Sequence, residues 1–273
     1  STLVQGARMD CAPVPGSGMN HQWTVTTGFQ TSEASANVTR YKAPEIHSIS
    51  EDQWPWSTTA GGDFVTITGD QMGPLSPSAG NGANTIFSFF GSDAQLDDEK
   101  GFRTIVDSCK LLTAHVSLVC QVGMGTGANH SWQLYVSNQS SIRYFANSRY
   151  ASPVINSFST NISEVATTNE FATSGGELFI ITGLNFGPLH AQKNSTLSSG
   201  YIAPLSVYVS WSDEFTFTNE DCMVTVPHTE LQCITGFGVG QDLQWVVEVD
   251  SLKNSLAATS YGAPELHSLT LYE

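Results

Sequence analysis

The sequence predicts an all-β fold in which two-sheet β-sandwich domains follow one another along the chain. Three observations predict it. A spaced motif occurs three times, short stretches alternate apolar and polar residues, and clusters of Gly, Pro, Ser and Asn separate these stretches about every ten residues. This punctuation is typical of a two-sheet sandwich, and no stretch of the sequence has the pattern of a long helix.

The repeated motif contains a Cys, two Gly residues five and seven positions later, a Trp twelve positions later, and a Tyr three positions before a Pro. Its copies are Cys11, Gly16, Gly18, Trp23, Tyr41 and Pro44; Cys120, Gly125, Gly127, Trp132, Tyr150 and Pro153; and Cys233, Gly238, Gly240, Trp245, Tyr261 and Pro264. The prolines lie 109 and then 111 residues apart, which is the length of a compact domain rather than of a solenoid repeat. We therefore expect a linear array of domains.

The domain boundaries follow from this motif and from a second landmark, a Gly-Gly pair before an apolar strand that ends in Thr-Gly, at 61–69 and 175–183. We expect the second half of a domain, two complete domains and the first strand of a further domain, at residues 1–43, 44–152, 153–263 and 264–273. A chain that starts and stops inside domains is expected to be a segment of a longer protein.

The strands follow from alternation at a period of two, with stretches that begin at Val65, Phe87, Trp132, Val207 and Trp245. The recurring Trp keeps a fixed distance from the Cys, which indicates a core residue packed on a disulfide. Stacking on a sugar ring is the alternative for an exposed aromatic residue. The two glycines after the Cys, and the Gly-Gly pairs, are expected at turns that need positive φ.

The five cysteines predict disulfides, because each complete domain holds two that are eleven residues apart. The predicted pairs are Cys109 with Cys120 and Cys222 with Cys233, and Cys11 is expected to pair with a residue that precedes Ser1. Paired strands bring facing Cα atoms within disulfide range, so the spacing suits a hairpin crosslink. A metal or redox site is the alternative, but no CxxC occurs. Disulfides indicate an extracellular or luminal location.

The net charge excludes one class of partner. The chain carries 25 acidic and 10 basic residues, a formal charge of −15, whereas binding to a nucleic acid needs clustered Lys and Arg. No apolar run approaches the roughly 20 residues that span a bilayer, so we expect no membrane contact within this segment. The acidic run 97–99 lacks the alternation of a calcium loop and is expected to be an exposed loop. We expect no metal and no cofactor.

No catalytic motif is present in the sequence, which has no GxSxG elbow and no HExxH helix. His47 and His267 occupy matching positions just after a domain start, which indicates a structural or interdomain role. We therefore expect no catalytic residue and no enzymatic activity.

The ordered landmarks resemble those of IPT/TIG domains, which are immunoglobulin-like sandwiches. The resemblance rests on the strand after Pro153, the Gly-Gly turn, the stretch 185–187, Cys-x10-Cys, Gly-x-Gly and the closing Tyr. Such domains occur in plexins, in hepatocyte-growth-factor-type receptors and in fibrocystin-like surface proteins. The resemblance implies an extracellular tandem array and transfers no binding residue, since the same domain type serves DNA-binding and starch-degrading proteins. The sequence departs from the pattern at about 74–84 and 190–203, in Ser-, Gly- and Asn-rich stretches.

Two functions without catalysis remain open. The first is a structural glycoprotein that forms a fibre, stalk or surface filament, whose short Tyr-x-x-Pro junctions limit bending. The second is an adhesion or recognition ectodomain that binds a surface protein or a glycan. Equal treatment of successive domains favours the first, and an apolar patch exposed on one domain alone would favour the second. The partners expected are neighbouring domains of the same long chain, by self-association, or a surface protein or glycan.

Glycosylation is predicted from five Asn-x-Ser/Thr sequons in a chain with the signs of secretion. The predicted sites are Asn37, Asn129, Asn138, Asn161 and Asn194.

Overall fold

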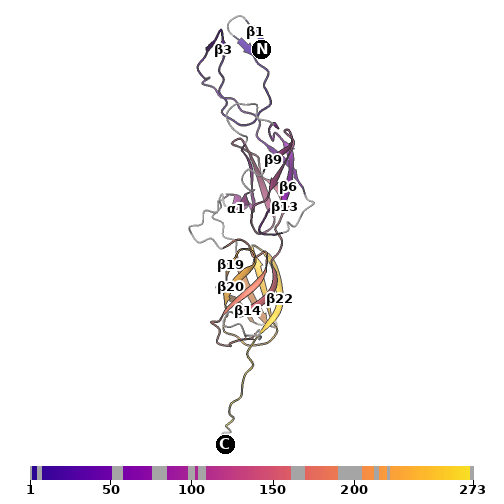
Figure 1. Ribbon diagram of the computed structural model, residues 1–273, viewed down its shortest axis with the longest axis vertical. Coiled ribbons are helices and arrows are strands. Elements are labelled where there is room, and N and C mark those ends of the chain that lie inside the picture. Colours follow the sequence, from indigo (N-terminus) through magenta and orange to yellow (C-terminus); the bar gives the residue numbers. More distant parts are fainter. Residues whose placement is uncertain are drawn as a thin grey trace.

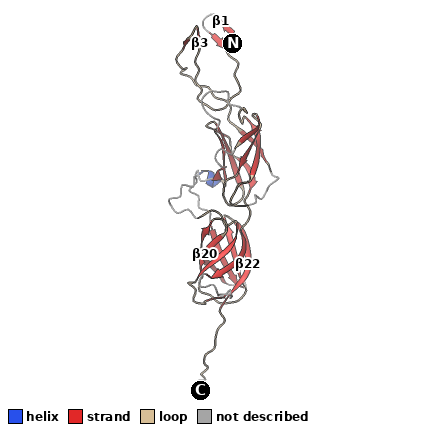
Figure 2. Ribbon diagram, in the orientation of Figure 1, coloured by secondary structure: helices blue, strands red, loops and turns tan. Residues whose placement is uncertain are grey.

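The computed structural model shows an elongated molecule, in which an N-terminal segment and two β-sandwiches follow one another end to end (Figure 1). A C-terminal tail leaves the second sandwich at the end opposite to the first. The structure describes residues 2–4, 8–50, 58–75, 85–97, 102–103, 109–160, 170–189, 205–211, 215–219 and 222–270. Strands make up nearly all of its regular structure, and one short helix, α1 (Asp93–Asp97), flanks the first sandwich (Figure 2).

The first sandwich consists of two antiparallel sheets. One sheet has the order β5 (Glu45–Ile49), β6 (Phe64–Asp70), β10 (Ser117–Gln121), β9 (Lys110–Thr113). The other has the order β12 (Gln139–Ser140), β11 (His130–Val136), β7 (Ile86–Gly91), β8 (Phe102–Arg103), and β13 (Tyr144–Ser148) also pairs with β11.

The second sandwich repeats this plan. One sheet has the order β14 (Val154–Thr160), β16 (Leu178–Leu184), β20 (Glu230–Ile234), β19 (Met223–Val226). The other has the order β15 (Glu170–Phe171), β22 (Leu252–Tyr261), β21 (Leu243–Val249), β17 (Leu205–Trp211), β18 (Phe215–Asn219), and β15 pairs with β22 in parallel. The chain is thus a tandem array of immunoglobulin-like sandwiches, and the predicted all-β fold class is confirmed.

Alternation places the core between the two sheets. In β11, Trp132, Leu134 and Val136 are fully buried, and in β21 Trp245 and Val247 are buried in the same way. Full burial of a large apolar side chain contributes about 1.5–3 kcal/mol, so these strands supply much of the stability of each sandwich.

The described residues of the N-terminal segment form two short hairpins, β1 (Thr2–Val4) with β2 (Arg8–Asp10) and β3 (Thr26–Thr27) with β4 (Gln30–Thr31), and one bridge between His21 and Thr39. The prediction of a core Trp is wrong here, because Trp23 is 50% exposed whereas Trp132 is 0% and Trp245 3% exposed. The physical reason is that no opposing sheet covers this Trp among the described residues of 8–43.

The motif Trp and Tyr make the same hydrogen bonds in all three copies. The indole N–H of Trp23, Trp132 and Trp245 donates to the hydroxyl of Thr39, Ser148 and Thr259, at 2.9, 2.9 and 2.7 Å. The hydroxyl of Tyr41, Tyr150 and Tyr261 donates to the carbonyl of Val14, Gly123 and Gly236, at 2.8, 2.7 and 2.9 Å. Each motif therefore closes a local network that does not depend on the rest of the sandwich.

The motif glycines serve two purposes, of which the sequence predicted one. Gly18, Gly127 and Gly240 have φ of 93°, 86° and 116°, as expected of a turn that needs positive φ. The expectation is wrong for the first glycine of the pair. A Cβ on Gly16 or Gly238 would lie 2.6 or 2.5 Å from the ring of the motif Tyr, so this position needs Gly for space.

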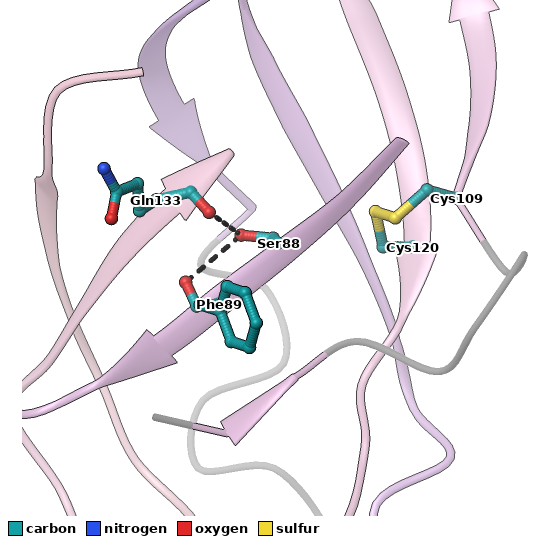
Figure 3. Close-up of a disulfide and its surroundings, with 5 residues drawn as sticks. All are labelled: Ser88, Phe89, Cys109, Cys120 and Gln133. Atoms are coloured by element: carbon teal, nitrogen blue, oxygen red, sulfur yellow. Dashed lines mark hydrogen bonds between the residues drawn. A yellow bond between two sulfur atoms is a disulfide. The ribbon is translucent and has the colours of Figure 1, made fainter. Parts of the chain in front are cut away.

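Disulfides join Cys109 to Cys120 and Cys222 to Cys233, with Cα atoms 4.0 and 4.2 Å apart. These are the pairs predicted from the sequence. Each closes a hairpin, because Lys110 faces Val119 in the first sandwich and Met223 faces Gln232 in the second. Figure 3 shows the first disulfide together with Ser88 of β7.

Candidate functional site

The outward face of the β7–β11 sheet carries a cluster of aromatic rings, here called the aromatic face: Phe87, Phe89 and Tyr135. Phe87 and Tyr135 stack with ring centroids 4.9 Å apart and an interplanar angle of 7°. Phe89 meets both rings edge to face, with centroids 5.6 Å apart in each case. All three side chains are half-buried, so part of each ring remains accessible.

Backbone register determines this outward placement. Ser88 faces Leu134 and Phe90 faces Trp132, so the inward positions of β7 are Ser88 and Phe90, both fully buried. The Ser88 hydroxyl donates to the carbonyls of Gln133 and Phe89, at 3.0 and 3.3 Å (Figure 3). These bonds offset the cost of burying a hydroxyl, and the flanking aromatic side chains are left outside.

Two polar groups border the aromatic face. The Tyr135 hydroxyl donates to Gln133 Oε1 at 3.3 Å, and Gln133 Nε2 donates to the carbonyl of Ser141 at 3.1 Å. The amide of Gln133 is therefore held beside the rings. A surface of aromatic rings with one oriented amide and one phenol can bind a ligand that has both apolar faces and hydroxyl groups.

The second sandwich carries a non-aromatic residue at two of the three equivalent positions, and Tyr208 occupies the third, that of Phe89. Because Val209 pairs with Trp245 as Phe90 pairs with Trp132, the counterpart of Phe87 is Ser206 and that of Tyr135 is Glu248. The stacked pair Phe87 and Tyr135 is therefore not repeated at the equivalent positions of the second sandwich.

Sequence analysis identified the β7 strand but missed its outward aromatic side chains. The run Phe87-Ser88-Phe89-Phe90 fits either face, since apolar residues occupy both phases of the alternation. Alignment with Ser206-Val207-Tyr208-Val209 is the signal that resolves the phase, because Val207 and Val209 are the inward residues there.

A second structural site is the contact between consecutive units, which recurs in the same form. We call residues 16–18, 125–127 and 238–240 the docking loops, and the residue five positions after a buried motif Trp the receiving residue, Ser137 or Asp250. In the first contact, Ser17 Oγ lies 2.9 Å from Ser137 Oγ. In the second, Thr126 Oγ1 donates to Asp250 Oδ2 at 3.1 Å.

The docking loops approach the next unit closely. A Cβ on Gly127 would lie 2.5 Å from Asp250 Oδ2, and one on Gly18 would lie 3.2 Å from Ser137 Cβ. Gly187 is constrained from the other side, because its Cβ would lie 2.8 Å from Thr126 Cγ2. Gly18 and Gly127 therefore allow the close contact between units and also form the turn.

Further hydrogen bonds hold the two sandwiches together. Asn185 Oδ1 accepts from the Thr59 N–H at 3.3 Å, and Asn185 Nδ2 donates to the carbonyl of Ser152 at 3.0 Å. The Thr59 hydroxyl lies 2.7 Å from His228 Nδ1, and burial lowers the pKa of His228. These contacts fix both the linker and the loop beside it.

Histidines brace two of the docking loops. His21 Nε2 bonds to the carbonyl of Ser17 and His130 Nε2 to that of Thr126, both at 3.1 Å. Burial lowers the pKa of His130 to about 4, and the bond to Thr126 opposes this shift. The third copy has the fully buried Leu243 at this position.

The other predicted residues lie apart from these sites. Asn37, Asn129 and Asn138 are exposed, whereas Asn161 and Asn194 and most of the two insertion-like stretches lie outside the described residues. Cys11 is exposed and forms no disulfide with a described residue.

His47 Nε2 lies 3.7 Å from carboxylate oxygens of Glu45 and Asp70, on the surface. The acidic run begins at the end of α1, and Asp97 pairs with Arg143 at 2.7 Å.

No group of three or more His, Cys, Asp or Glu side chains among the described residues is placed to hold a metal ion. No helix in the described part of the chain is long and apolar enough to cross a membrane.

No family model and no curated protein matches this chain in sequence. Three of the solved structures that it matches are a surface glycan-binding protein from Prevotella bryantii (16% identity, 79% of this chain and 41% of that chain, TM-score 0.44), the adhesin InvE from Yersinia pseudotuberculosis (10%, 76% and 56%, 0.39) and a titin Ig tandem (10%, 81% and 97%, 0.27). The chain spans less than two thirds of the length of the first two. The assignment to a tandem immunoglobulin-like fold comes from the sheets of this chain itself.

Proposed function

We propose that this chain is an extracellular, non-catalytic recognition segment of the IPT/TIG type, which binds a glycan through the aromatic face. The observation that carries the proposal is the stacked pair Phe87 and Tyr135, whose equivalent positions in the second sandwich carry Ser206 and Glu248. Residues needed for the fold recur in both sandwiches, so an outward cluster that does not recur is a candidate for binding.

The chemistry of the aromatic face favours a sugar ring as ligand. The C–H groups on one side of a pyranose can pack on an aromatic ring, while its hydroxyls need hydrogen-bonding partners at the edge. Phe87 and Tyr135 offer the rings, and Gln133 with the Tyr135 hydroxyl offers the polar edge. An extracellular location is supported by the two disulfides, which the cytosol would keep reduced.

A binding experiment with matched variants tests this proposal. Soluble neutral polysaccharides, namely glucans, mannans and xylans, would be screened by affinity electrophoresis against the wild type, Tyr135→Ser and Glu248→Ser. We expect Tyr135→Ser to weaken binding by roughly five- to 150-fold, the equivalent of the roughly 1–3 kcal/mol that stacking of a nucleobase on an aromatic side chain contributes. Glu248→Ser, at the equivalent position of the second sandwich, should leave binding unchanged. Binding of no polysaccharide, or equal loss in both variants, would contradict the proposal.

A second candidate function is a structural array, in which the chain is part of a fibre or stalk. It is favoured by the recurring contact between docking loop and receiving residue, which treats successive units alike. Electron microscopy of native material distinguishes the two functions. Long regular filaments with a domain-sized repeat would support the array, and isolated flexible monomers would count against it.

Glycosylation at the sequons is part of the proposal. Asn37, Asn129 and Asn138 are exposed in the structure, so an oligosaccharide can be attached without displacing the core. Intact-mass measurement before and after glycosidase treatment checks it. We expect the mass to fall, and an unchanged mass would show that the sequons are unoccupied.

A further inference from the structure

The second sandwich ends in a docking loop that no described residue covers as the earlier loops are covered. Thr126, the middle residue of loop 125–127, is 0% exposed beneath Asp250, and the adjacent glycines are buried. Val239, the middle residue of loop 238–240, is 58% exposed. Positive φ recurs at Gly127 and Gly240, so the backbone of this docking loop is formed without a neighbour.

A second position at the same end shows the same contrast. The carbonyls of Thr59 and Thr173 accept hydrogen bonds from Gly125 and Gly238, at 2.9 and 3.0 Å, so the two threonines occupy equivalent places. Thr59 is 1% exposed because Asn185 and His228 of the next sandwich contact it. Thr173 is exposed. The surface that the first sandwich buries against the second is therefore present again, and open, on the second.

The tail that leaves this end carries apolar side chains without cover. Leu266 and Leu269 are 82% and 78% exposed, whereas Ile46 and Ile49, at the same distances from a Pro, are 6% and 4% exposed in β5. Residues 264–270 form no strand here, because a strand needs a hydrogen-bonded partner. Whether they are the first strand of a further domain remains a prediction.

We propose that the end of the second sandwich, formed by Thr173 and loop 238–240, is a docking site for a further sandwich of the same type. Residues 264–270 are the first strand of that sandwich, and its receiving residue contacts Val239. Two contacts of the same kind within this chain support the docking site, which depends on the repeated contact and not on any glycan ligand.

The side chain of Val239 also specifies the partner. Ser17 and Thr126 offer a hydroxyl to Ser137 and Asp250, but Val239 cannot donate a hydrogen bond. A carboxylate buried against it would lose water without gaining a donor. The receiving residue of the docked sandwich is therefore apolar or small rather than acidic.

Cysteine trapping in an extended chain tests the docking site. Residues 1–270 would be followed by a copy of residues 51–152, so that 264–270 replace the first strand of the copied sandwich. All variants carry Cys11→Ser.

The test pair is Val239→Cys with the copied Ser137→Cys. The reference pair is Thr126→Cys with Asp250→Cys in the unextended chain. The control pair is Val239→Cys with the copied Ile142→Cys, which lies on an exposed position outside the receiving turn.

We expect most molecules with the test or reference pair to form the new disulfide, and none with the control pair. Hydrogen exchange at 264–270 shows independently whether the copied sandwich has folded. A folded copy in which only the reference pair forms would overturn the proposal. If this copy does not fold, a second extension with a copy of residues 160–261 is made, with its Asp250→Cys as the partner of Val239→Cys. If 264–270 stay unprotected in both extensions, the proposal is wrong.

A separate measurement tests the prediction that the residue contacting Val239 is not acidic. In the second extension without added cysteines, hydrogen-exchange protection of residues 238–240 should rise about tenfold when the copied Asp250→Ala removes the carboxylate. Equal protection with Asp and Ala would contradict the specificity assigned to Val239.

Discussion

The two sandwiches share their internal hydrogen bonds but differ in their outward faces. In both, the motif Trp bonds to a hydroxyl on the last strand and the motif Tyr bonds to a backbone carbonyl. The stacked pair Phe87 and Tyr135 lies on the first sandwich, whereas the equivalent positions of the second carry Ser206 and Glu248. Residues that repeat between the sandwiches maintain the fold, and residues that differ between them are candidates for function.

Replacing the motif Trp should cause the largest loss of folding stability. Trp132→Ala should destabilise the first sandwich by about 3–5 kcal/mol, because it removes a fully buried indole that stacks on Phe90 at 4.5 Å. Trp245→Ala should have a similar effect on the second sandwich. Trp23→Ala should cost less than about 1 kcal/mol, because half of that side chain is exposed.

Hydrogen exchange of amides near each Trp measures the three effects separately, which matters because a chain of several domains does not unfold as one unit. An equal loss of protection for Trp23→Ala and Trp132→Ala would show that the N-terminal segment has a core that the structure does not contain among its described residues.

The second effect is the pH dependence that His130 gives to the first sandwich. The folded pKa of His130 is about 4, below its ordinary value of 6.5, so the unfolded state binds a proton more readily. Stability from this group is complete above pH 6.5, is lost as the pH falls towards 4, and is constant below that. At 1.36 kcal/mol per unit the total is about 3 kcal/mol.

Leu243 is the natural control, since it occupies the same position in the second sandwich. Thermal unfolding of the wild type and of His130→Leu, measured from pH 7 to pH 4, checks the prediction. The variant should lose the part of the acid sensitivity that belongs to the first sandwich, while the dependence from His228 remains. Equal acid sensitivity in the two proteins would exclude His130 as its source.

The smallest loss of stability is expected from Gly→Ala substitutions in two docking loops, 125–127 and 238–240. Gly127→Ala and Gly240→Ala both place a Cβ at positive φ, which costs roughly 1–2 kcal/mol. Gly127→Ala should also separate the sandwiches, because the new atom would meet Asp250. Small-angle scattering should therefore show a broader distribution of lengths for Gly127→Ala than for Gly240→Ala. The same distribution for both would mean that the docking loop does not hold the sandwiches together.

The sequence predicted those features that local physics determines. The cysteine spacing of eleven predicted both hairpin disulfides, because a hairpin brings residues at that separation face to face. Alternation predicted β11 and β21 with the correct inward face. Positive φ at Gly18, Gly127 and Gly240 followed from the absence of a Cβ.

What the sequence did not predict depends on contacts between distant residues. The outward placement of Phe87 and Phe89 depends on the register of β7 against β11, which a run of three Phe around one Ser leaves open. The contacts of Thr59 with Asn185 and His228 join residues more than a hundred positions apart. The role of Gly16 and Gly238 depends on a Tyr ring that reaches back over the loop.

The Tyr anchor has a mechanical consequence when the two ends of the molecule are pulled apart. A force that pulls on the C-terminal tail reaches the second sandwich at Tyr261. The hydroxyl of Tyr261 donates to the carbonyl of Gly236 and its backbone N–H donates to the carbonyl of Gly240, so these two hydrogen bonds bear the force first. Behind them, β22 runs parallel to β15, and a parallel pair pulled along its length must break its hydrogen bonds together rather than in turn. The Tyr that ends the second sandwich thus resists unfolding of that sandwich under tension.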